Sequence, residues 1–199
     1  MNSARQPKKK TIYLACEGGD VGTEGTYISQ LCKKYGCALI WVYNKSADPL
    51  TLANMSVDFS KRNTNLRKND EMWVVFDNDD PAKVKEAFAA VVRHNRTKKK
   101  NCKEIGIAFN APSAETFALL CCGVKNISEN RTSNQTALSK RMKNYDHAKS
   151  PRFDFDMMEN GYPSAVSQAE NWKNTYKNNR EYEAPKFAGI CKLAESIKK

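Results

Sequence analysis

Three acidic residues stand where runs of apolar residues stop. Glu17 follows the run Thr11–Cys16, and Asp77 and Asp79 follow the run Met72–Phe76. Each run reads as a buried strand, and the carboxyl ends of strands in an open α/β sheet line the crevice where ligands bind. Three carboxylates there would form a hard-oxygen site suited to Mg²⁺. In a chain with a net charge of +11, such a metal predicts chemistry on a phosphodiester.

The segment Asp77–Pro81 (DNDDP) carries the stronger acidic signal. Alternate residues of extended backbone point the same way, so we expect Asp77 and Asp79 to share one cation. Without a cation, carboxylates this close would raise one another's pKa. Asp79 also fits an ordinary turn residue. Asp80 reads as the N-cap of a helix whose first residue is Pro81.

Two further acids are candidates for the same crevice. Glu24 follows a glycine-rich turn after Glu17, and it fits a helix-start charge facing the macrodipole better than a helper in the site. Glu115 begins a helix just after the fourth predicted strand, with a cap partner or a salt-bridge residue as the alternative. The turn is neither a Walker loop nor a dinucleotide loop, because no Gly-Lys-Ser/Thr and no G-x-G-x-x-G spacing is present.

The elements that must position these acids alternate between strands and amphipathic helices. The predicted strands are Thr11–Cys16, Ala38–Tyr43, Glu71–Phe76 and Glu104–Phe109. The predicted helices are Thr23–Tyr35, Leu50–Leu66, one that starts at Pro81, and a short one that carries Phe117 and Leu120. This order predicts an α/β fold with a parallel sheet of about four strands and helices on both faces. Right-handed crossovers then place all the strand carboxyl ends on one edge.

The chain divides into three parts. Residues 1–10 form a basic tail, residues 11–125 an α/β catalytic domain, and residues 126–199 a helical C-terminal region that packs on this domain. Within the last part, Asn126–Thr136 is polar and predicts a linker or an exposed loop. Three helical patterns with apolar stripes follow it, at Ala137–Tyr145, Pro163–Asn178 and Ala184–Ile197.

The positive charge is clustered. Between positions 93 and 103 lie six basic residues, namely Arg93, Arg96, Lys98, Lys99, Lys100 and Lys103. Clustered Lys and Arg favour a polyanionic partner such as nucleic acid, although a solvated loop without a partner has the same composition. Lys149 and Arg152 are candidate phosphate contacts. His147 beside them is a candidate helper in proton transfer.

Composition excludes several other classes. No apolar run reaches the ~18 residues that a membrane span needs. Met1–Lys10 has no apolar core of a secretory signal, so we expect a cytoplasmic protein. Seven cysteines without a CxxC pair, together with two histidines, indicate reduced thiols rather than a zinc site.

Several motifs together resemble the RloB-like family, which is associated with restriction–modification loci and antiphage defence. The first is Cys16-Glu17-Gly18 followed by Thr23-Glu24 and Tyr27, and the second is Trp73–Asp79 (WVVFDND). Asn110–Glu115 resembles the family's Asn-Pro-x-Phe-Glu segment, with one extra residue and Ala114 in place of the aromatic. Tyr145–Lys149 and Ala165–Trp172 resemble its C-terminal half, so the resemblance covers most of the chain from Thr11.

The resemblance implies a Toprim-like fold and a Toprim-type site. Glu17 would then be a metal ligand or a general acid/base, Asp77 and Asp79 would hold Mg²⁺ or Mn²⁺, and Glu115 could reach the same crevice. The expected function is a metal-dependent nuclease that acts on RNA, tRNA by analogy, or on DNA, in prokaryotic defence.

Two other functions stay open. One is a non-catalytic module of Toprim-like fold that binds nucleic acid or senses phage. The other is phosphoryl or nucleotidyl transfer to a small nucleotide, against which the lack of a Gly-Lys phosphate loop counts. A second copy of the chain or another protein of the same defence system is a further expected partner.

Overall fold

Five strands form one sheet in the order β2-β1-β3-β4-β5 in the computed structural model, which describes residues 9–149, 152–175 and 180–199. The strands are β1 (Thr11–Cys16), β2 (Ala38–Tyr43), β3 (Glu71–Asp77), β4 (Ile105–Ala111) and β5 (Phe187–Ala188). The first four pair in parallel, whereas β5 pairs antiparallel with β4. The predicted α/β class is confirmed, with a fifth short strand that the sequence did not predict.

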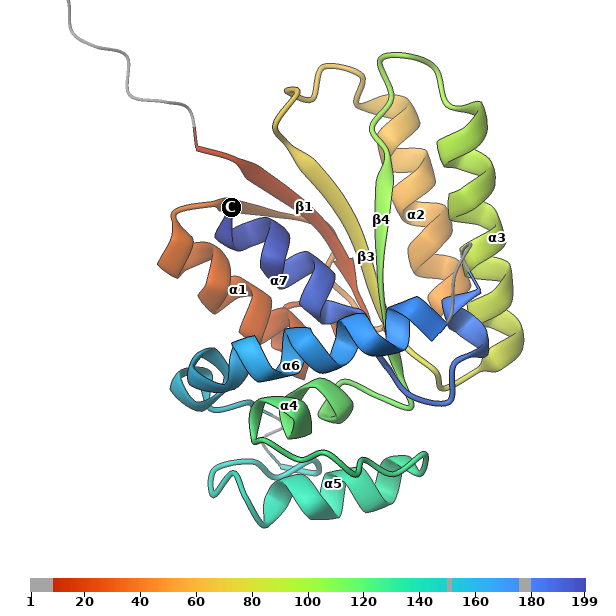
Figure 1. The fold of residues 1–199 in the computed structure, drawn as a ribbon. Coiled ribbons are helices and arrows are strands. Elements are labelled where there is room, and N and C mark those ends of the chain that lie inside the picture. The colour runs from red at the N-terminus through yellow and green to blue at the C-terminus, as the bar shows by residue number, and fades with distance from the viewer. Residues whose placement is uncertain (1–8, 150–151, 176–179) are drawn as a thin grey trace, which may run out of the picture.

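Helices cover both faces of this sheet (Figure 1). They are α1 (Thr23–Tyr35), α2 (Pro49–Arg62), α3 (Pro81–Thr97), α4 (Glu115–Cys121), α5 (Arg131–Ser139), α6 (Phe155–Thr175) and α7 (Ile190–Lys198). Two 3₁₀ turns, η1 (Gly19–Val21) and η2 (Glu181–Glu183), complete the elements. Helices α2 and α3 lie on one face, and α1, α6 and α7 lie on the other. No helix of the described ranges is long and apolar enough to cross a membrane.

The strand side chains alternate between two apolar cores. Ile12 and Leu14 of β1 point into the core shared with α1, α6 and α7. Val74 and Phe76 of β3 point into the core shared with α2 and α3. Because both faces are covered, the strands are continuous apolar runs rather than alternating ones. All seven cysteines are free thiols, as the sequence predicted.

The connections place the carboxyl ends of β1, β3 and β4 together at the lower edge of the sheet in Figure 1, above α4 and α5. Local capping starts α3 at this edge. The side chain of Asp80 accepts a hydrogen bond from the backbone N–H of Lys83 at 3.2 Å, and Pro81 is the first helical residue. The predicted cap is therefore confirmed.

The predicted linker 126–136 is wrong in its second half, because α5 begins at Arg131. The side chain of Asn130 caps this helix by accepting from the backbone N–H of Ser133 at 2.9 Å. The segment is so polar that no apolar stripe revealed the helix. The predicted helix Ala137–Tyr145 is also wrong beyond Ser139, where α5 ends.

The last two predicted helices have different starts in the structure. Helix α6 begins at Phe155 and contains Pro163 in its interior. Pro163 removes one backbone hydrogen bond from the helix. The burial of Met158 and the contacts of its neighbours with the core offset this loss. Between 184 and 189 the chain forms β5 instead of a helix, because Phe187 pairs with Ala111 of β4. The predicted helix end at 176–178 and residues 1–8 of the predicted tail lie outside the described residues.

Candidate acidic site at the strand ends

The ends of β1 and β3 are joined by a side chain. Glu17 continues β1 by donating its backbone N–H to the carbonyl of Val75 at 2.9 Å. Its Oε2 accepts a hydrogen bond from the backbone N–H of Asp77 at 3.1 Å. The structure thus brings together two of the three acids that the sequence placed at strand ends.

A tight turn returns the chain from Glu17 to the start of α1. Gly18 and Gly19 both have positive φ, at 77° and 63°. A Cβ atom on Gly19 would lie 2.2 Å from the carbonyl oxygen of Asn44, so only glycine fits there. The turn carries Glu24, in the first turn of α1, back towards the strand ends.

Glu24 is more than a helix-start charge. It lies in the first turn of α1, as predicted, but it is only 7% exposed. Burial raises its pKa to about 7, with further contributions from the charges of Glu115 and Glu17. A glutamate that faced water at the start of a helix would not be buried beside other carboxylates.

Asp77 lies at the centre of the acidic group. It is buried, and burial raises its pKa well above the ordinary range, followed by the charges of Glu24, Glu115 and Glu17. The amide of Asn110, its register partner on β4, donates to Asp77 Oδ1 at 3.3 Å. Asn110 therefore holds the Asp77 side chain from the neighbouring strand β4, while the negative charge of the Asp77 carboxylate is poorly compensated.

The one cation found beside Asp77 in the described part of the chain comes from α5. Arg131 forms an ion pair with Asp79, and its Nη2 lies 3.9 Å from Asp77 Oδ2. Asp77 and Asp79 thus share a cation, but it is a guanidinium. Sequence reasoning missed Arg131 because it lies in the segment predicted as a linker. The N-cap signal of Asn130 was the local clue to the helix that positions it.

Glu115, the first residue of α4, is surrounded by donors. Ser113 and Tyr145 both donate hydroxyl hydrogen bonds to its carboxylate, and His147 Nδ1 lies 3.3 Å from its Oε1. Burial by itself would raise the pKa of Glu115, but the bonds from Ser113 and then Tyr145 outweigh it, so the pKa is lowered. The structure thus brings Glu115 and His147 together, two candidates that the sequence analysis had named for separate reasons. Tyr145 had been noted only as part of a family-like segment.

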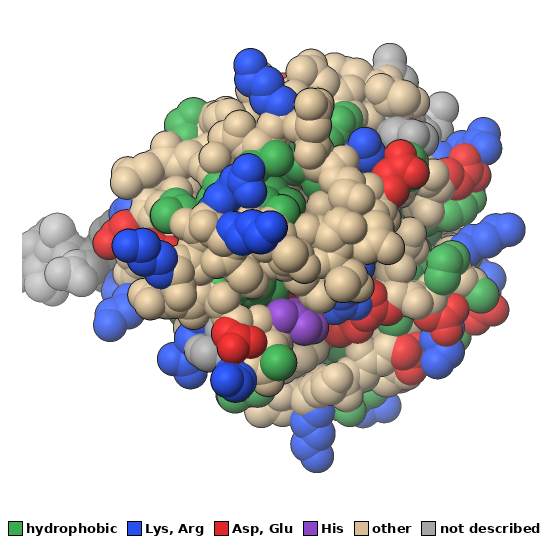
Figure 2. Space-filling model, turned by 90° about the horizontal axis from the view of Figure 1, so that it is seen from below, with side chains coloured by type: hydrophobic (Ala, Val, Ile, Leu, Met, Phe, Trp, Pro, Cys, Tyr) green, Lys and Arg blue, Asp and Glu red, His purple; other side chains and the backbone are tan. Residues whose placement is uncertain are grey.

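The basic run 93–103 is separated from the acidic group by most of the length of α3. Helix α3 starts beside Asp79 and runs for 17 residues, so its end is about 25 Å away at 1.5 Å per residue. Arg93 and Arg96 lie in the last turns of α3, and the four lysines of the basic run follow its end. Lys149 and Arg152 are exposed. Figure 2 views the molecule from the side of the strand ends, and acidic and basic side chains are mixed on this face, with a histidine beside an acidic group.

The donor set has the chemistry of a hard-cation site, since every candidate ligand atom is a carboxylate oxygen. Several carboxyl groups are crowded here, and the pKa values of Asp77, Glu24 and Glu17 are all raised, with burial the leading cause in each. The chemistry therefore fits a divalent ion. Within the described ranges, however, no three His, Cys, Asp or Glu side chains are arranged as a bound metal would require.

Comparison with known proteins identifies one family. The model of the family described as RloB-like protein matches residues 12–197, which is nearly the whole chain. No curated protein and no solved structure matches.

Proposed function

Since the chain belongs to the RloB-like family, we propose that it is a divalent-metal-dependent nuclease that acts in prokaryotic antiphage defence. The substrate is RNA, with tRNA as the first candidate, or DNA. The observation that carries the proposal is the crowding of Glu17, Glu24 and Asp77 at the strand ends, with pKa values raised by burial and by their neighbours' charges. Such crowding is costly unless a cation is recruited to the site.

Each side chain of the site would have its own role in the proposed reaction. Asp77, Asp79 and Glu17 would hold Mg²⁺ or Mn²⁺, which supplies charge stabilisation on the phosphoryl oxygens. Arg131 would turn from Asp79 to a phosphate oxygen, because guanidinium groups bind phosphate in the same forked geometry as carboxylate. His147 Nδ1 lies 3.3 Å from Glu115 Oε1, and this close pair of titratable groups would move a proton in the reaction.

One observation favours the alternative of a non-catalytic module that binds nucleic acid or senses phage. Arg131 already pairs with Asp79 and approaches Asp77, so an internal cation neutralises part of the site. A site stabilised in this way would not need a metal. It would bind nucleic acid through its basic surface, with a steep dependence on salt and without turnover.

Cleavage assays test the nuclease. Total tRNA, mRNA and plasmid DNA are incubated with the protein in EDTA, Mg²⁺ or Mn²⁺. We expect cleavage only with a divalent ion, and its loss in Asp77→Asn and Glu17→Gln. Asp80→Asn is the matched control, because it removes one carboxylate three residues away while Asn still caps α3. Full activity of Asp77→Asn, or no cleavage of any substrate by the native protein, would refute the assignment.

Metal binding separates the two functions. A titration with Mg²⁺ followed by thermal melting should stabilise the native protein by about 2.7 kcal/mol at one hundred times the dissociation constant. The double variant Asp77→Ala/Asp79→Ala should lose this stabilisation. A native protein that binds RNA but melts at the same temperature with and without Mg²⁺ would support the non-catalytic module.

A further inference from the structure

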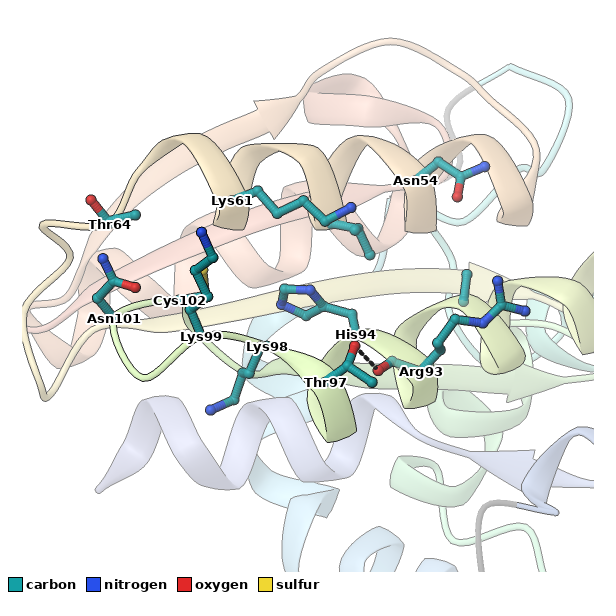
Figure 3. A pocket seen from close by; sticks show the side chains of 12 residues that line it. Asn54, Lys61, Thr64, Arg93, His94, Thr97, Lys98, Lys99, Asn101 and Cys102 are labelled. Carbon is teal, nitrogen blue, oxygen red and sulfur yellow. Dashed lines mark hydrogen bonds between the residues drawn. The ribbon is translucent and has the colours of Figure 1, made fainter.

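A cavity of about 550 Å³ lies between α2 and α3, closed at one end by the segment 98–102 (Figure 3). It is distinct from the acidic site. The acidic residues lie at the start of α3, whereas Arg93, His94 and Thr97 line this cavity from its last turns. The lining on α3 begins at Ala90, nine residues after Pro81, so the cavity starts roughly 14 Å along the helix from the acidic site.

The cavity is strongly basic. Lys61 of α2, Arg93 of α3, and Lys98 and Lys99 of the following segment all line it. None of the described residues that line it is acidic. Lys98 has a long contact of 3.6 Å with Glu104, which lies outside the lining. Like charges around a concave surface with low-dielectric walls concentrate positive potential inside it and attract anions.

The rest of the lining offers neutral donors, acceptors and an apolar surface. Thr64 and Asn101 lie at one end of the lining in Figure 3 and Asn54 lies at the other, and each can hydrogen-bond a sugar or a base. Val57 and Ala90 supply apolar surface between the two helices. A bare inorganic anion would use only the cationic part of such a lining.

Two contacts of the helix end stabilise the cavity wall. The ring of His94 is buried, and its Nε2 lies 2.9 Å from the carbonyl oxygen of Lys103. A carbonyl can only accept, so Nε2 carries the hydrogen and the segment 98–103 is tied to α3. Thr97 donates its hydroxyl to the carbonyl of Arg93 at 2.8 Å. The basic side chains therefore extend from a backbone that is held in place.

We propose that this cavity binds a nucleoside phosphate, with the cationic side chains on the phosphate and the neutral part of the lining on the nucleoside. Its volume lies within the range of about 300–1,000 Å³ of small-ligand sites, and a nucleic-acid duplex is too wide to enter it. A nucleoside phosphate of this kind occurs either as a free nucleotide or as the phosphorylated end of a nucleic-acid strand. This inference goes beyond the nuclease assignment and does not depend on it.

Calorimetric titration in EDTA tests the proposal with three probes. They are ATP, a 5′-phosphorylated RNA octanucleotide, and the same octanucleotide with a 5′-hydroxyl group. EDTA removes metal-mediated binding at the acidic site. The test variant is Arg93→Gln/Lys99→Gln, which removes two charges from the lining. The matched control is Arg96→Gln/Lys100→Gln, which removes two exposed charges from the same basic run outside the lining.

We expect the test variant to bind ATP or the 5′-phosphorylated RNA at least about tenfold more weakly than the native protein, because each phosphate contact by Arg or Lys is charge-assisted. The control variant and Asp77→Asn should bind as the native protein does. Preference for ATP identifies a free nucleotide, and preference for the phosphorylated over the hydroxyl-ended octanucleotide identifies a strand end. Equal weakening in test and control variants, or no binding of any probe, would overturn the proposal.

Discussion

The backbone N–H of Asp77 donates to Oε2 of Glu17 across 3.1 Å, so the side chain that ends β1 satisfies a backbone donor at the end of β3. This bond ties two parallel strands together where their ladder stops. It also orients Glu17 next to Asp77. Burial and then the charge of Asp79 raise the pKa of Glu17, and the hydrogen bond from the Asp77 backbone acts against this rise.

Removal of the internal cation should make the site bind metal more strongly. In Arg131→Gln, the carboxylates of Asp77 and Asp79 lose their guanidinium partner. Without metal we expect a loss of about 1 kcal/mol in the free energy of unfolding, since the arginine is partly exposed. With Mg²⁺ the melting temperature should rise more in the variant than in the native protein, because the ion no longer competes with the guanidinium.

Arg141→Gln is the control for this experiment, because it removes an exposed arginine shortly after α5. Its response to Mg²⁺ should equal that of the native protein. An equal Mg²⁺ shift in all three proteins would show that Arg131 does not compete with the metal.

Glu24→Gln should stabilise the metal-free protein in a way that depends on pH. Burial raises the pKa of Glu24 from 4.5 to about 7 in the folded state. Because the folded state keeps the proton on Glu24 to a higher pH than the unfolded state does, the stability of the fold is greatest below about pH 4.5. The contribution of Glu24 to the free energy of unfolding is lost as the pH rises through about 7. Relative to the variant, the native protein should therefore lose up to about 3 kcal/mol across that window.

Urea unfolding in EDTA, at several pH values between about 4.5 and 8.5, measures this difference. Glu86→Gln, at an exposed position on α3, is the control for loss of a carboxylate. If both variants follow the same pH profile relative to the native protein, the buried environment of Glu24 is not its cause.

Tyr145→Phe should weaken the hydrogen-bonded group around Glu115. The buried Tyr145 hydroxyl donates to the Glu115 carboxylate, and its loss should cost about 1–3 kcal/mol at neutral pH. The pKa of Glu115 is lowered in the fold from its ordinary value of 4.5, so this stability is present above that pH and fades as the pH falls below it.

Tyr35→Phe provides the comparison, because Tyr35 makes the same kind of bond to Glu159 at 3.0 Å but at an exposed position. Its cost should stay within about 0.5 kcal/mol. Chemical denaturation at neutral and acidic pH measures both variants. A Tyr145→Phe cost that stays constant down to about pH 3 would contradict the role of ionised Glu115.

Gly161→Ala should separate α6 from α4. A Cβ atom at position 161 would lie 1.8 Å from the carbonyl oxygen of Cys121, which is backbone and cannot rotate away. We expect a loss of about 1–3 kcal/mol or more, measured by thermal or urea unfolding. Ser164→Ala, exposed on the same helix, should change stability by less than about 0.5 kcal/mol. Equal stability of the two variants would contradict this packing.

The sequence by itself determined the elements whose signals are local. Apolar runs predicted the four parallel strands, and helical periodicity between them predicted the crossovers. Once the crossovers are right-handed, Glu17 and Asp77 must lie on one edge of the sheet. The Asp80 cap with Pro81 was also predictable, because the bond spans only three residues. These features depend on neighbours along the chain, so pattern and spacing are enough to predict them.

Only the tertiary structure decided what surrounds these acids. Arg131 reaches Asp79 across 52 positions, and Tyr145 reaches Glu115 across 30. The burial of Glu24 depends on how α1 packs against the strand ends, although its place in the first turn was visible in the sequence. Side-chain contacts between distant segments have no period or spacing in the sequence, since packing alone brings them together.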